Sequence, residues 1–119
     1  MPKWDSRLIG TWKSDRRRTF LHWRPKRNCP PKVYERFKAL FGKLQIRWGR
    51  GRYYSVMDGV KETHSYEVLA SDRSSVVIRK SEADLVFDEL MQIYFDNEDC
   101  YWIALGNGLC EYFKRVTDS

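Results

Sequence analysis

The feature that most constrains this sequence is an alternation of apolar and polar residues between positions 43 and 116, in short segments separated by short turns. Leu44, Ile46 and Trp48 alternate with charged or polar neighbours, a pattern typical of a strand with one buried face. The pair Asp58-Gly59 is a strong signal for a two-residue hairpin turn. Short turns between successive strands predict an antiparallel meander.

We expect strands at 7–13, 43–48, 52–57, 60–70, 75–80, 89–95, 100–105 and 109–116. The segment 19–23 is either a further strand or an irregular extension, and 81–88 is expected to be a longer loop. So many strands with such short turns usually close into a barrel. The predicted fold class is therefore mainly all-β, an antiparallel up-and-down β-barrel of about eight strands. The length of 119 residues predicts a single domain, 1–119.

One helix is expected after the first strand segment, at 30–41. Pro30-Pro31 suits its first turn, and Gly42 is a natural stop. So short a helix is unstable alone, so its apolar stripe must lie on an apolar surface. The stripe consists of Val33, Phe37, Leu40 and Phe41. A solvated basic loop is expected around Arg16, Arg17, Arg18, Arg24, Lys26 and Arg27.

Charge is distributed unevenly along the chain. Residues 1–52 carry 16 Lys and Arg against 3 Asp and Glu, which gives +13, whereas residues 53–119 carry 6 against 13, which gives −7. A basic half can bind nucleic acid or another polyanion. The alternative is that the two halves complement each other within one fold or across a homodimer. The six cations of the basic loop are the candidate polyanion site.

The three cysteines, Cys29, Cys100 and Cys110, are an odd number with no metal-ligand spacing. We therefore expect reduced thiols in a cytoplasmic protein, no metal site and no cofactor. Cys29 lies in a basic stretch that could lower its pKa, but a structural or incidental thiol is the simpler interpretation. No apolar run is long enough to span a membrane, and no signal peptide is visible.

Gly10-Thr11-Trp12, near the start of a β-meander, resembles the Gly-x-Trp signature of the calycin superfamily, which includes lipocalins and intracellular lipid-binding proteins. Small bacterial barrels of this kind are the nearest likeness. The resemblance implies a barrel that binds an apolar ligand inside, and a late basic residue, Lys114 or Arg115, packed against Trp12. Gly10, Trp12 and Arg115 would then close the barrel.

The chain departs from the fatty-acid carriers of that superfamily at its last strand. Those carriers hold the ligand carboxylate with an inward Arg-x-Tyr, and matching the chain ends puts Glu111 and Phe113 at these positions. A buried glutamate repels a carboxylate. This departure therefore favours a neutral or cationic ligand over a fatty acid.

Turn lengths predict how the last three strands pair, and opposed residues share a face. If the face of Arg115 is the interior, the pocket candidates are Trp12, Gln92, Tyr94, Tyr101, Glu111 and Phe113. The outer face then carries an apolar stripe of Ile93, Trp102 and Tyr112, which is either a partner or dimer surface or is covered by the chain itself. A register error of one residue would exchange the two faces.

Two further groups suggest other chemistry. Glu62 and His64 share a strand face and could form a hydrogen-bonded pair, but no nucleophile accompanies them, and an exposed polar strand face accounts for them more simply. The segment 47–54 interleaves basic and aromatic residues, as single-stranded nucleic-acid platforms do, although a tight hairpin also needs its glycines. We therefore expect a non-enzymatic barrel that binds a small apolar or neutral ligand, with polyanion binding or a homodimeric interaction role as alternatives.

Overall fold

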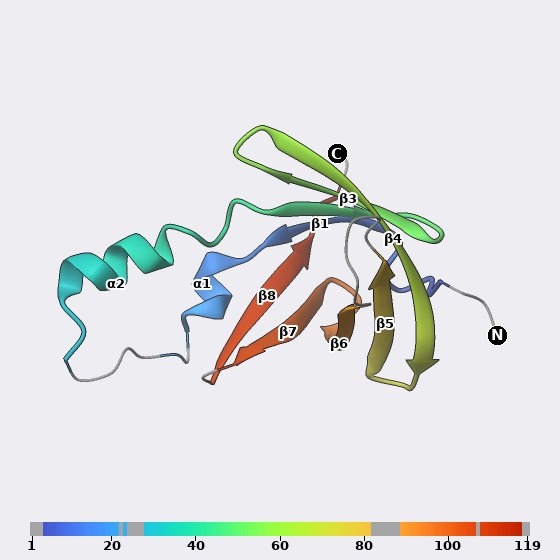
Figure 1. Cartoon of the computed structure of the whole chain (residues 1–119). Coiled ribbons are helices and arrows are strands. Elements are labelled where there is room, and N and C mark those ends of the chain that lie inside the picture. Colours follow the sequence, from blue (N-terminus) through green and yellow to red (C-terminus); the bar gives the residue numbers. More distant parts are fainter. Residues whose placement is uncertain (1–3, 22, 24–27, 82–88, 107, 118–119) are drawn as a thin grey trace.

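The chain forms a closed barrel of eight antiparallel strands that follow one another in chain order (Figure 1). The computed structural model describes residues 4–21, 23, 28–81, 89–106 and 108–117. The strands are β1 (Gly10–Ser14), β2 (Gln45–Trp48), β3 (Arg52–Met57), β4 (Val60–Ser71), β5 (Ser75–Ser81), β6 (Glu89–Asn97), β7 (Cys100–Gly106) and β8 (Leu109–Arg115). The predicted up-and-down β-barrel is confirmed. The loop expected at 81–88 lies outside the described residues, apart from Ser81 at the end of β5.

The barrel closes where β1 pairs with β8, the two strands farthest apart in the sequence. Trp12 lies opposite Arg115, and Lys13 lies opposite Lys114. At the tip of the β3–β4 hairpin, Asp58 and Gly59 both have positive φ, 51° and 81°. Two such residues form the turn whose twist matches that of paired strands, so the predicted hairpin is confirmed.

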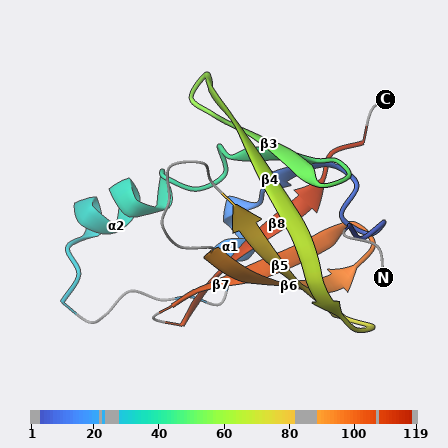
Figure 2. The ribbon, with the colours of Figure 1, turned by 45° about the vertical axis from the view of Figure 1, so that its right-hand side comes forward.

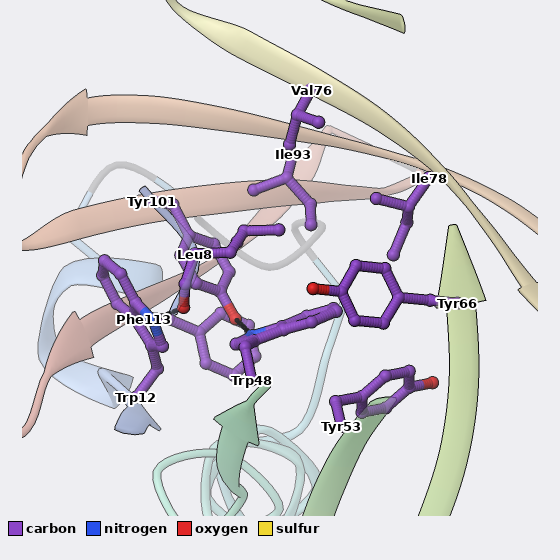
Figure 3. Packing of buried hydrophobic residues seen from close by; sticks show 10 residues of the cluster. All are labelled: Leu8, Trp12, Trp48, Tyr53, Tyr66, Val76, Ile78, Ile93, Tyr101 and Phe113. Atoms are coloured by element: carbon purple, nitrogen blue, oxygen red, sulfur yellow. Dashed lines mark hydrogen bonds between the residues drawn. The ribbon is translucent and has the colours of Figure 1, made fainter. Parts of the chain in front are cut away.

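The core fills the barrel from one face of each strand (Figure 3). Leu8, in the segment before β1, is fully buried and contributes to this cluster. Its carbonyl accepts a hydrogen bond from the indole nitrogen of Trp12 at 2.8 Å. Within the described part of the chain, every buried side-chain nitrogen and oxygen has a hydrogen-bond partner. The polar atoms of the core are therefore satisfied.

The predicted pairing of β7 with β8 is correct from Cys100 to Ala104 but wrong at the turn, where Leu109 lies opposite Gly106 and not opposite Leu105. The predicted pairing of β6 with β7 is wrong. Tyr101 lies opposite Phe113, but Tyr94 lies opposite Trp102 rather than Tyr101. A register irregularity between Phe95 and Asn97 adds a residue to β6. A shift of one residue moves each side chain to the other face, so β6 is inverted relative to the sequence-based expectation.

Two helices follow β1, where the sequence predicted one. The helix α2 (Pro31–Lys38) matches the expected helix but ends three residues early. The helix α1 (Arg16–Thr19) occupies part of the stretch expected to be a basic loop. It forms because the side chain of Asp15 accepts a hydrogen bond from the Arg18 amide and so caps the first turn. No strand forms in the described residues of 19–23, where Phe20 and Leu21 continue into a turn.

The helix α2 stands beside the barrel and not on its sheet (Figures 1 and 2). The buried ring of Phe20 is surrounded by two aromatic residues of α2, Tyr34 and Phe37, and by Phe41 just beyond the helix. The distances between ring centroids are 6.2 Å to Tyr34, 5.9 Å to Phe37 and 5.3 Å to Phe41. Phe37 and Phe41 of the predicted stripe therefore do contact an apolar surface, as expected. Of the predicted apolar stripe, Val33 and Leu40 are exposed.

Candidate ligand-binding site

A cavity of about 260 Å³ lies inside the barrel at one end. Part of its lining comes from the starts of β4 and β6 and from the end of β5, positions that an antiparallel order brings to the same end. The rest reaches into the barrel core, where Trp48, Tyr53 and Tyr101 belong to the buried cluster. The lining comprises Leu44, Ile46, Trp48, Tyr53, Ser55, Glu62, His64, Lys80, Met91, Tyr101, Ile103, Glu111 and Phe113.

Aromatic rings form the rigid inner wall of the cavity. Trp48 lies 4.6 Å from Tyr53 between ring centroids, and its indole nitrogen donates to the Tyr101 hydroxyl at 3.2 Å (Figure 3). Tyr101 also stacks on Phe113 at 4.9 Å. Burial raises the pKa of the Tyr101 phenol well above its usual range, so this hydroxyl stays protonated.

Glu111 is a buried carboxyl in the cavity wall. The Ser14 hydroxyl donates to its Oε2 at 2.8 Å and accepts the Gly42 amide at 3.1 Å. Burial raises the pKa of Glu111, although the Ser14 hydrogen bond lowers it in part. The cavity therefore contains a carboxyl that favours its neutral form more than an exposed glutamate does.

Glu62 and His64 form the hydrogen-bonded pair that their spacing suggested, with 3.2 Å between His64 Nε2 and Glu62 Oε2. Both residues line the cavity, so the interpretation of a simple exposed strand face holds for the exposed Glu62 but not for His64. The His64 ring stacks on Tyr53 at 4.8 Å and its side chain is 13% exposed, whereas Glu62 is 63% exposed. The pair therefore lies at the mouth of the cavity.

Three of the six predicted pocket residues line the cavity, namely Tyr101, Glu111 and Phe113. Trp12 is fully buried in the core but is not part of the lining. Gln92 and Tyr94 do not line it, because they pair with Val77 and Ser75 on the outer face of the sheet. Sequence reasoning also missed residues of β2 to β5 in the lining, among them Ser55 and Lys80. Each of these two residues lies two positions along its strand from a buried residue. Strand alternation could therefore have placed both on the inner face.

The three residues expected to close the barrel meet at the β1–β8 seam. The Arg115 guanidinium lies over the Trp12 ring at 4.3 Å. Gly10 has a φ of 129°, and a Cβ there would come within 2.8 Å of Arg115 Nη1. A side chain at position 10 would therefore displace the guanidinium.

The predicted outer stripe differs in one member. Ile93 is fully buried in the core, so its assignment to a partner surface is wrong. The cause is the register irregularity of β6, which also moves Gln92 and Tyr94 to the outer face. Tyr94 takes its place and stacks on Trp102 at 4.2 Å, with Tyr112 at 6.2 Å from Trp102. We call Tyr94, Trp102 and Tyr112 the aromatic row.

Of the candidate polyanion residues, Arg16, Arg17 and Arg18 are exposed on α1. Arg24, Lys26 and Arg27 lie outside the described residues. Among the described residues, no group of three or more His, Cys, Asp or Glu side chains could hold a metal ion. No described helix has the length and apolar character needed to span a membrane.

Comparison of the chain with models of protein families, with curated proteins and with solved structures found no match. The eight-strand antiparallel barrel is compatible with a calycin-like fold.

Proposed function

We propose that this chain is a non-enzymatic binding protein that holds a small neutral or apolar molecule in the barrel cavity. The observation that carries the proposal is the cavity itself, with aromatic walls and a buried carboxyl. Pockets of this kind, apolar with a few polar groups that orient the ligand, are typical of small-molecule sites. The Gly10-x-Trp12 motif and its Arg115 partner support a calycin-like relationship.

The volume of the cavity indicates a compact ligand. A dry protein cavity of about 150 Å³ binds benzene, and pockets for drug-sized ligands begin near 300 Å³. A cavity of about 260 Å³ therefore suits a molecule of one or two rings. A long acyl chain would need more space.

The buried carboxyl of Glu111 argues against a ligand carboxylate placed beside it, although Lys80 also belongs to the lining. Glu111 is 8% exposed, and an anionic group beside it would have to share a desolvated site with a second carboxyl. A ligand hydroxyl, amine or indole N–H could instead donate to the Glu111 carboxyl. The Tyr101 and Trp48 rings would stack on its apolar part.

The test combines native mass spectrometry of the purified protein with thermal shifts against defined probes. Indole, 2-naphthol and benzyl alcohol are the neutral probes, and indole-3-carboxylate and 2-naphthoate are their anionic counterparts. We expect a co-purifying small molecule or a rise in melting temperature with the neutral probes, and a smaller shift with the anions. The absence of both a bound molecule and any thermal shift would refute the proposal.

Adjacent residues of β3 offer a matched pair of variants. Ser55 lines the cavity, whereas Val56 is 38% exposed on the opposite face. Ser55→Trp should fill the cavity and abolish probe binding, and Val56→Trp should leave binding within about twofold. Equal binding by both variants would place the ligand outside the barrel.

A further inference from the structure

A second hollow, of about 770 Å³, lies outside the barrel between the β1–β8 seam and the helices. Six cationic side chains line it, and Asp15 is the single acidic residue of the lining. We call this hollow the basic groove, and its cations are Lys13, Arg16, Arg17, Lys38, Lys43 and Lys114.

The cations of the basic groove come from segments that are distant in the sequence. Antiparallel pairing of β1 with β8 places Lys13 opposite Lys114, and α1 adds Arg16 and Arg17. Lysines directly opposite each other repel, so the pairing costs free energy unless an anion lies between or near them.

The positive charge of the groove is poorly compensated by the rest of the protein. Lys43 lies 3.6 Å from Asp58. Within the part of the chain that the structure describes, Lys13, Arg16, Arg17 and Lys114 have no carboxylate within 4.0 Å. Asp15 accepts the Arg18 amide as a helix cap. Five of the 16 cations of residues 1–52 thus line the basic groove, and ion pairs within the described residues do not neutralise most of them.

The aromatic row continues from the basic groove along the same outer face. Tyr112 lies two residues from Lys114 on β8, so both side chains point outward. Arg18 connects the two features, because its guanidinium lies 5.8 Å from the Tyr112 ring and its Nη1 donates to Cys100 Sγ at 2.9 Å. Cations of α1 and β8 therefore lie beside an outward aromatic ring.

We propose that the basic groove and the aromatic row together bind single-stranded nucleic acid. The cations would neutralise successive phosphates, and Tyr112 and Trp102 would stack on bases. This combination binds single strands with little sequence preference. The surface is separate from the barrel cavity, so the two proposals succeed or fail independently.

The test is fluorescence anisotropy with a 5′-labelled dT12 oligonucleotide at 50 to 300 mM salt. We expect binding at low salt that weakens steeply, with a slope of log K against log salt near −3 if about four phosphates are neutralised. The double charge reversal Arg17→Glu with Lys114→Glu should weaken binding at least tenfold. Arg73→Glu, on the exposed β4–β5 turn away from both helices (Figures 1 and 2), is the matched control and should change it less than twofold.

The aromatic part of the proposal has its own readout. Trp102→Leu should weaken dT12 binding about tenfold, within the range for one lost base stack, but should leave the binding of inorganic polyphosphate unchanged. If this variant unfolds by circular dichroism, photocrosslinking of a bromouridine oligonucleotide to the unmodified protein takes its place, with crosslinks expected at Trp102 or Tyr112. No binding at 50 mM salt, or equal loss in the Arg73→Glu control, would overturn the proposal. Equal affinity for polyphosphate and dT12 would overturn the assignment to nucleic acid.

Discussion

Arg115 lies over the indole ring of Trp12 with its guanidinium carbon 4.3 Å from the ring centroid, and the two residues face each other across the seam that closes the barrel. Arg115 also donates to the carbonyl oxygens of Ile9 and Arg7, each at 3.0 Å. One side chain thus links the last strand to the first strand and to the segment that precedes it.

Replacing Arg115 should therefore destabilise the whole barrel. Arg115→Met keeps an apolar stem over Trp12 but loses the cation–π contact. It also leaves the carbonyls of Ile9, Arg7 and Glu98 without their charged donor. We expect the free energy of unfolding to fall by about 2–4 kcal/mol, as measured by urea denaturation. Arg73→Met, at an exposed turn, should change it by less than about 0.5 kcal/mol. Similar values for both variants would show that the seam contact adds no stability.

Glu111 should make stability fall as pH rises. Burial raises the pKa of Glu111 above the ordinary value of 4.5, so the folded chain binds more protons than the unfolded chain between the two pKa values. The free energy of unfolding therefore declines as pH rises from about 4.5 through the raised pKa of the folded state, and levels off above it.

The variant Glu111→Gln removes this titration and should be more stable than the unmodified protein at pH 7 but not at pH 4. Urea denaturation between pH 4 and pH 8 measures the difference. Glu98→Gln, at an exposed position, should follow the pH profile of the unmodified protein. A constant difference between Glu111→Gln and the unmodified protein across this range would contradict the prediction.

The sequence predicted the β-meander well because alternation and turn chemistry are local properties. The strand Arg52–Met57 and the Asp58-Gly59 turn are as expected. The faces of β6 were not predictable in the same way. One added residue near Asp96 moves every earlier side chain of β6 to the opposite face of the sheet from the one expected. Tyr94 and Ile93 are both apolar enough for either face, so their residue types could not reveal the shift.

The candidate site was predictable only where strands could be paired with confidence from their turns. Tyr101, Glu111 and Phe113 belong to the β7–β8 hairpin, whose pairing around them is as expected. Ser55 lies on a strand for which no face was assigned, and His64 was assigned to an exposed strand face, so their place in the cavity became evident only with closure of the barrel. Closure pairs β1 with β8, a contact between distant residues that no local pattern specifies.

The three cysteines should differ in reactivity. Cys100 is 3% exposed, and burial raises the pKa of its thiol, although the nearby Arg18 lowers it in part. Thiolate is the reactive form, so Cys100 should react with iodoacetamide at pH 8 about tenfold more slowly than Cys29 and Cys110, which are half-buried. Peptide mass spectrometry gives the three rates. In urea the rates should converge, and a fast Cys100 in the folded protein would contradict this picture.

The attachment of α2 should depend on Phe20. An isolated helix of eight residues is not stable in water, and α2 contains no buried residue of its own. Phe20 is 6% exposed and its ring contacts those of Tyr34 and Phe37. Each such ring pair contributes about 0.5–1.5 kcal/mol.

We therefore expect Phe20→Ala to reduce hydrogen-exchange protection in residues 31–38 at least tenfold, while protection of the barrel strands changes little. Leu21→Ala is the matched control, because Leu21 is the next residue and is 54% exposed. Far-UV circular dichroism should show a loss of helix signal in the first variant only. Retained protection of α2 in Phe20→Ala would mean that contacts other than the Phe20 ring hold the helix beside the barrel.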